Sequence, residues 1–185
     1  MAKDVMHETE DRMKKAEEAV ARELAGIRTG KANPALLDPV RVDYYGAPTP
    51  LRQLANVTAP EPRLIVIQPF DKRGIGDIEK AIQKSSLGLN PASDGNLIRI
   101  PIPPLTEERR RDLTKLVRKI GENGKVAVRN IRRDANDQLK KLERDGEVTE
   151  DEGKKQHDRV QTLTDKYIQD IDKMIERKEK EVMEV

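Results

Sequence analysis

The chain has 185 residues, of which 38% are charged and 35% hydrophobic, with three Tyr, one Phe and no Trp, so its cores must be aliphatic. Disorder driven by net charge is not expected, because 36 basic and 34 acidic residues leave only +2. The absence of Cys excludes disulfides, thiolate nucleophiles and Cys-ligated metals. We expect a cytoplasmic protein without a membrane segment, since no run of about 18 apolar residues and no signal-peptide pattern is present.

Proline divides the sequence into parts. All eleven prolines lie between residues 31 and 105. Because proline breaks a helix interior at a cost of about 3 kcal/mol, the flanks can form long helices, whereas the middle must consist of strands, turns and short helices. We therefore predict a helical domain from residues 1–30 and 106–185, with a second domain, residues 31–105, inserted into it.

The flanks predict three long amphipathic helices. The first ends near Gly30, and the second begins after Thr106. Gly121 and Gly124 could kink or end the second helix, but one continuous helix is favoured because the apolar period resumes in phase after them. A capping box at 149–152 starts the third helix. The expected buried stripes are Met6, Thr9, Met13, Ala16, Val20, Leu24 and Ile27, then Leu113, Leu116, Ile120, Ala127, Ile131, Ala135, Leu139 and Leu142, and finally Val160, Leu163, Tyr167, Ile171, Met174 and Val182. Three such helices cover one another's apolar faces in a bundle.

The middle segment predicts a small β/α/β domain. Short strands are expected at 40–45, 51–58, 63–68 and 96–102, with a short helix around Ile75 to Ile82 that Gly88 terminates. The fold class is thus α+β, a three-helix bundle with this domain inserted. The two crossings, 29–31 and 103–105, predict a hinge at Gly30, Lys31, Pro103, Pro104 and Leu105, because glycine admits unusual backbone angles and consecutive prolines stay outside helix and sheet. The alternative is a rigid corner, since two crossings restrict motion more than a single linker does.

The sequence offers little for catalysis. His7 and His157 are the only histidines and lie among helical charges, and the few serines have no nearby His. These patterns do not predict a metal site or a nucleophilic triad. We expect no enzymatic activity, no catalytic residues and no cofactor.

Charge is distributed unevenly along the predicted bundle. Residues 109–141 carry twelve basic and four acidic side chains, whereas residues 143–185 carry nine basic and fourteen acidic ones. A basic face recurs at helical spacing away from the apolar stripe and consists of Arg118, Lys125, Arg129, Arg132, Asn136 and Lys140. Such a face can neutralise successive phosphates, and without interleaved aromatic residues it suits structured RNA rather than single strands. An equally open interpretation is that it pairs with the acidic third helix.

Several blocks of sequence resemble one known family. They are IRTGKANP at 27–34, YYG at 44–46, TPL at 49–51, LGLNP at 87–91, PPLTEERR at 103–110 and VAVRNIRRD at 126–134. In this order and at these separations they resemble the ribosome recycling factor family over essentially the whole chain. The resemblance implies an elongated, roughly L-shaped, tRNA-like molecule with a three-helix bundle and a smaller β/α/β domain.

The resemblance also implies a function and partners. Members bind the post-termination ribosome and, with elongation factor G and its GTP hydrolysis, split it into subunits for new initiation. The implied contacts are to ribosomal RNA of the large subunit, through residues that match Arg110, Arg129 and Arg132, with Asn130 and Arg133 beside them. With the basic face, the expected RNA-binding set is Arg110, Arg118, Lys125, Arg129, Asn130, Arg132 and Arg133, in a chain that acts as a monomer. The alternative is a helical adaptor that binds proteins and has no ribosomal role.

Overall fold

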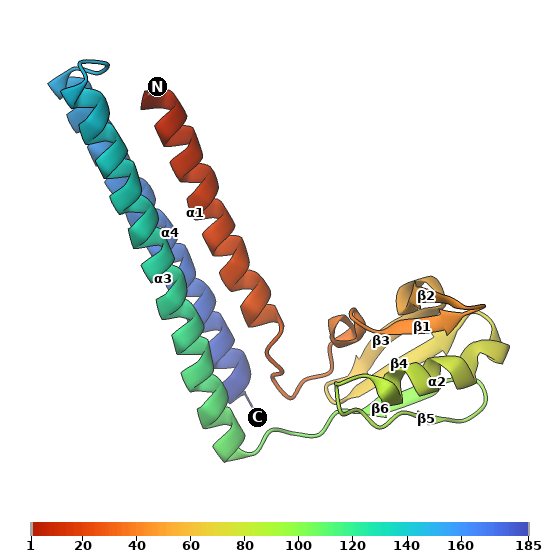
Figure 1. Cartoon of the computed structure of the whole chain (residues 1–185). Helices are drawn as coiled ribbons and strands as arrows, with labels where there is room; N and C mark the ends of the chain where they lie inside the picture. The colour runs from red at the N-terminus through yellow and green to blue at the C-terminus, as the bar shows by residue number, and fades with distance from the viewer. Residues whose placement is uncertain (1, 185) are drawn as a thin grey trace. The chain divides into compact units, whose positions relative to one another are not determined.

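The structure, a computed structural model, describes residues 2–184 and divides the chain into two compact units (Figure 1). Unit 1 runs to Ile27 and resumes at Glu107, and unit 2 is Arg28–Thr106. The divisions therefore fall at 27/28 and 106/107, close to the 30/31 and 105/106 that proline placement predicts. No helix within residues 2–184 combines the length and the apolar content that a membrane span needs.

Unit 1 is a bundle of three helices, as predicted. They are α1 (Ala2–Ala25), α3 (Glu107–Arg144) and α4 (Glu150–Met183), and each contacts both others. The first helix ends earlier than the expected Gly30, since after Ala25 the chain closes with a tighter turn in which Ile27 N–H donates to the Leu24 carbonyl. The fully buried side chains include Met13, Val117, Val128, Val160 and Ile171, so the core is built from aliphatic residues and Met.

The predicted capping box is present at the start of α4. The Thr149 hydroxyl accepts from the Glu152 N–H at 3.1 Å, and the Glu152 carboxylate accepts from the Thr149 N–H at 3.2 Å. Two amides that would otherwise lack partners at the helix start are thereby satisfied.

The buried stripe of α3 differs from the prediction at three positions. Leu116 is 43% exposed while Val117 is fully buried, and Ala127 is only half-buried while Val128 is fully buried. The third, Leu142, is half-buried. The prediction treated the glycines as gaps in the stripe. In the structure Gly121 and Gly124 are themselves buried, and they complete the line of residues that faces α1 and α4.

These two glycines allow the helices to approach closely. A Cβ added at Gly121 would lie 1.7 Å from Cδ1 of Ile175, and one added at Gly124 would lie 2.3 Å from Cγ2 of Val20. Both distances are far below van der Waals contact. At Gly121 the clash is with the end of the Ile175 side chain, which can move, whereas at Gly124 it is with a methyl group of the β-branched and buried Val20. Glycine thus allows close packing against α4 and α1, although it weakens the helix by about 1 kcal/mol relative to alanine.

Unit 2 contains two antiparallel sheets and one α-helix. The first sheet is the hairpin of β1 (Arg41–Tyr44) and β2 (Ala47–Pro50). The second has the order β3-β4-β6-β5, from β3 (Ala55–Glu61), β4 (Leu64–Pro69), β5 (Ala92–Ser93) and β6 (Ile98–Pro101). The helix α2 (Ile75–Lys84) lies between β4 and β5 in the chain and contacts β1 and β5.

The core of this unit is formed by buried residues that alternate with more exposed ones along β4 and β6. Ile65 and Ile67 of β4, Ile98 and Ile100 of β6, and Ile82 of α2 are all fully buried. The strand residues are two positions apart in each strand, which places them on one face of the sheet. The sequence did not predict two of the strands, because β2 contains two prolines and β5 has only two residues, and the expected strand at 51–58 starts with a short 3₁₀ turn, Leu51–Gln53.

We predict that Gly124→Ala destabilises unit 1 by about 1–3 kcal/mol, although the same change raises stability in an exposed helix. Val20 is β-branched and strongly restricted in χ1, so its methyl group cannot easily move away from the new Cβ. Urea unfolding measures the effect. Asn123→Ala, at an exposed position one residue away, is the control and should be neutral or slightly stabilising.

A double-mutant cycle with Val20→Ala isolates the clash between these two side chains. If the clash is the cause, Gly124→Ala costs much less in the Val20→Ala background. Equal costs in both backgrounds would contradict this explanation.

Candidate nucleic-acid interface

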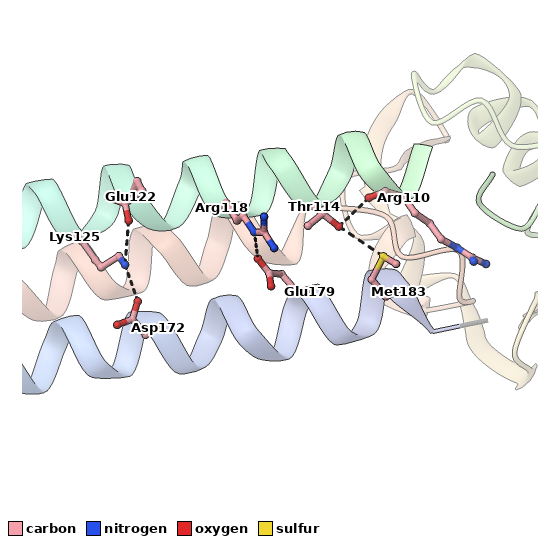
Figure 2. Close-up of polar contacts among 8 residues, drawn as sticks. All are labelled: Arg110, Thr114, Arg118, Glu122, Lys125, Asp172, Glu179 and Met183. Carbon is pink, nitrogen blue, oxygen red and sulfur yellow. Dashed lines mark hydrogen bonds and ion pairs between the residues drawn. The ribbon is translucent and has the colours of Figure 1, made fainter. Parts of the chain in front are cut away.

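The predicted RNA-binding side chains in the middle of α3 fall into two groups with different surroundings. The first group lies along the seam between α3 and α4 (Figure 2). Arg118 Nε donates to Glu179 Oε1 at 2.8 Å, and Lys125 Nζ lies 2.7 Å from Asp172 Oδ1 and 3.1 Å from Glu122 Oε1. Acidic residues of α4 thus neutralise part of the basic face that the sequence predicts.

Lys125 is the most enclosed of these cations. Its side chain is only 16% exposed, and its hydrogen bond to Asp172 raises its pKa above the ordinary value, against the opposing effect of burial. Asn136, another member of the predicted face, lies at the same seam, where its Oδ1 is 3.1 Å from His157 Nδ1 of α4. The structure therefore gives Arg118, Lys125 and Asn136 partners within the bundle, in line with the interpretation that the basic face pairs with the third helix.

The second group is the arginine cluster, which we define as Arg129, Arg132 and Arg133. Within residues 2–184 none of them forms a hydrogen bond or an ion pair. Their spacing of three and four residues places the side chains on one side of α3. Asn130 beside them is exposed and is likewise without a partner in the described chain.

Nearby carboxylates do not neutralise the arginine cluster. Asp134, the adjacent acid, pairs at 3.2 Å with Arg12 of α1, and Glu122 pairs with Lys125. Three guanidinium groups with free donors on one helix can bind phosphate oxygens bidentately without breaking an existing pair.

Arg110 lies apart from the arginine cluster. It is in the first turn of α3, and its side chain points away from the row of ion pairs (Figure 2). Its Nε is buried without a hydrogen-bond partner among the described residues. Nineteen residues separate it from Arg129, which is about 28 Å along a helix. The two positions thus form separate contacts rather than one pocket.

The described residues do not form a metal-binding cluster. Within 2–184, no group of three or more His, Asp or Glu side chains is placed to hold a metal ion. The free donors of α3 are thus the chemical feature that distinguishes the surface of unit 1.

Comparison with known proteins decides the family. The family model described as "Ribosome recycling factor" matches residues 20–183. The chain belongs to the ribosome recycling factor family. Ribosome-recycling factors of Halalkalibacterium halodurans and Bacillus subtilis are 65% and 59% identical to it, each over 100% of both chains.

Solved structures of the family have the same fold. A solution structure of a ribosome recycling factor is 47% identical, with a TM-score of 0.83, and the match covers 100% of this chain and 98% of the other. A second structure, of the T. thermophilus ribosome recycling factor described with E. coli elongation factor G bound to the E. coli post-termination complex, is 49% identical, with a TM-score of 0.67 and 100% coverage of both chains. The resemblance read from the sequence motifs is confirmed, and it places the chain in ribosome recycling, a step of protein biosynthesis.

We predict that Lys125→Gln lowers the free energy of unfolding of this recycling factor by about 0.5–1 kcal/mol at pH 7, because it removes the pair with Asp172. The unfolded lysine titrates near 10.5 and the folded one above it, so the pair stabilises fully below about pH 10.5. Its contribution is lost as the pH rises through the folded pKa.

Urea unfolding of wild type and variant at pH 7, 9 and 11 measures this difference. Lys119→Gln is the control, since Lys119 is exposed and has no ion-pair partner in residues 2–184. A constant difference across the three pH values would contradict the assignment to the ion pair.

Proposed function

We propose that this chain binds the post-termination ribosome and, with elongation factor G and GTP hydrolysis by that partner, promotes its dissociation into subunits. It acts in the cytoplasm as a monomer and contacts ribosomal RNA of the large subunit. Family membership supports the role, and a relative described together with elongation factor G on a post-termination complex supports the partners. The observation that carries the RNA contact is the unpaired arginine cluster on α3.

We propose fewer RNA-binding residues than the sequence alone predicts. Arg129, Arg132 and Arg133, with Asn130, have free donors and need no rearrangement to meet phosphates. Arg118 and Lys125 would first have to give up Glu179 and Asp172. We therefore assign those two to the stability of the bundle and keep Arg110 as a separate contact near the start of α3.

We predict that Arg129→Ala and Arg132→Ala each weaken binding to the large ribosomal subunit at least tenfold while changing stability by less than about 0.5 kcal/mol, because neither side chain is paired within the protein. The slope of log affinity against log salt should fall by about 0.7–0.9 for each phosphate that the variant no longer neutralises. Sedimentation or fluorescence binding over a series of salt concentrations measures both quantities.

Arg177→Ala is the matched control, since it removes an exposed arginine from α4 that is likewise unpaired in the described chain. Equal affinity and salt slope for all three variants and the wild type would refute RNA binding by the arginine cluster. A wild type without salt-dependent binding to the large subunit would favour the alternative adaptor role.

We also place the hinge at the ends of unit 2. Gly30 has φ +76°, and a Cβ there would lie 3.1 Å from Leu105 Cγ, so the two crossing segments pack together within unit 2. Ala32 N–H donates to the Pro62 carbonyl at 2.6 Å, and Ile102 N–H donates to the Arg63 carbonyl at 2.8 Å. The predicted hinge residues, which include Lys31, Pro103 and Pro104, thus belong to unit 2, and bending is proposed at 27/28 and 106/107.

Because the chain has no Cys, two introduced cysteines can carry a pair of dyes. We predict that a pair at Ser93→Cys and Lys155→Cys, one in each unit, gives a broad distribution of energy transfer in single molecules. A pair at Lys119→Cys and Lys155→Cys, both in unit 1, should give a narrow one. Equally narrow distributions would show that the junction does not bend.

A further inference from the structure

Three of the four aromatic side chains are exposed on unit 2. Tyr44, Tyr45 and Phe70 are 46%, 88% and 63% exposed, whereas Tyr167 of α4 is 4% exposed. All three line one cavity of about 240 Å³ between the β1–β2 hairpin, the end of β4 and the start of α2. A concentration of exposed aromatic residues in a chain with so few of them marks an interaction surface.

The backbone at Tyr45 is unfavourable for the residue it carries. Tyr45 and Gly46 form the two-residue turn of the hairpin with φ values of 49° and 82°. Such a turn favours Asn-Gly, and a bulky side chain with positive φ is strained. The Asp43 side chain supports the turn by accepting the Gly46 N–H at 2.9 Å. Folding alone would be served better by Asn at position 45, so local backbone stability does not account for the exposed ring.

The rim of the cavity is acidic. Asp43, Asp71 and Asp77 line it together with one cation, Arg73. Asp43 and Asp77 also line an adjoining pocket whose basic side chains are Arg41, Lys80 and Lys84. The backbone N–H of Arg73 donates to Asp71 Oδ1, and the Arg73 side chain lies with its Nε 3.3 Å from the same oxygen. These two hydrogen bonds, the backbone one first, hold the pKa of Asp71 below the usual range, so this carboxylate is charged at neutral pH. Asp77 has no hydrogen-bond or ion-pair partner among residues 2–184. Acidic side chains beside aromatic faces attract cations and repel phosphates.

We propose that this cavity is the docking site for an arginine side chain from a basic protein segment. The guanidinium stacks on the Tyr45 ring, the more exposed of the two, and pairs with Asp43 or Asp77. The Tyr44 ring lies edge-to-face with Tyr45, with the ring centroids 4.5 Å apart and the ring planes at 74°. Its aliphatic stem lies against Phe70. The cavity is smaller than the roughly 300 Å³ at which small-molecule sites begin, which suits one long side chain. The site belongs to unit 2 and does not depend on RNA binding by α3.

Nuclear magnetic resonance titration of the full chain tests the proposal. The probes are the blocked tripeptide Gly-Arg-Gly, its neutral isostere Gly-citrulline-Gly, and a uridine hexanucleotide. We expect saturable shifts of amides at 43–46 and 70–77 with the arginine peptide, at least fivefold weaker binding of the citrulline peptide, and no saturation there by the oligonucleotide. No shift in these segments, equal binding of both peptides, or saturation by the oligonucleotide would overturn it.

Substitutions separate the site from general electrostatic attraction. Tyr45→Asn removes the ring and gives the turn a preferred residue, so the unfolding free energy should be unchanged or higher while affinity for the arginine peptide falls at least fivefold. Asp77→Asn should weaken binding to a similar extent. Glu61→Gln removes the same charge from an exposed position of unit 2 that does not line the cavity, and it should bind as the wild type does. Equal losses in the Asp77 and Glu61 variants, or none in Tyr45→Asn, would overturn the proposal.

Discussion

The organisation of the bundle depends on the close approach of three helices at two glycines. A Cβ at Gly121 or Gly124 would displace the Ile175 side chain of α4 or the Val20 side chain of α1. With α3 packed close to α4 and oriented about its own axis in this way, Arg118 and Lys125 come within ion-pair distance of acids on α4. In the same orientation of α3, the arginine cluster remains unpaired. A packing constraint thus decides which cations stabilise the protein and which are available to a partner.

The acidic character of α4 has a structural role in this arrangement. Asp172 and Glu179 pair with α3, so a surplus of acids on one helix balances part of the surplus of bases on the other. Pairs of this kind are individually weak because their members are partly exposed. Their larger consequence is spatial, since Arg118 and Lys125 are held at the seam with α4 whereas the guanidinium groups of the arginine cluster stay unpaired.

The two units present opposite chemistry to their surroundings. Unit 1 offers guanidinium groups that suit phosphates, and unit 2 offers aromatic rings with carboxylates that suit a cation. In unit 2 the strained turn at Tyr45 shows that the sequence departs from the residue that local backbone geometry prefers. Such departures are expected where selection acts on binding rather than on stability.

Proline placement, hydrophobic period and motif blocks are local signals, and they predicted the inserted domain, the bundle, the capping box at Thr149 and the family. The basic excess on α3 was also evident from the sequence. Tertiary contacts were needed to show that Gly121 and Gly124 are packing sites rather than interruptions, and that Val117 replaces Leu116 in the core. They were also needed to show that Arg118 and Lys125 pair with acids of α4, and that Tyr44 and Phe70 line one cavity. Each of these depends on which helix face or loop meets which neighbour, and that is set by contacts between residues far apart in the chain.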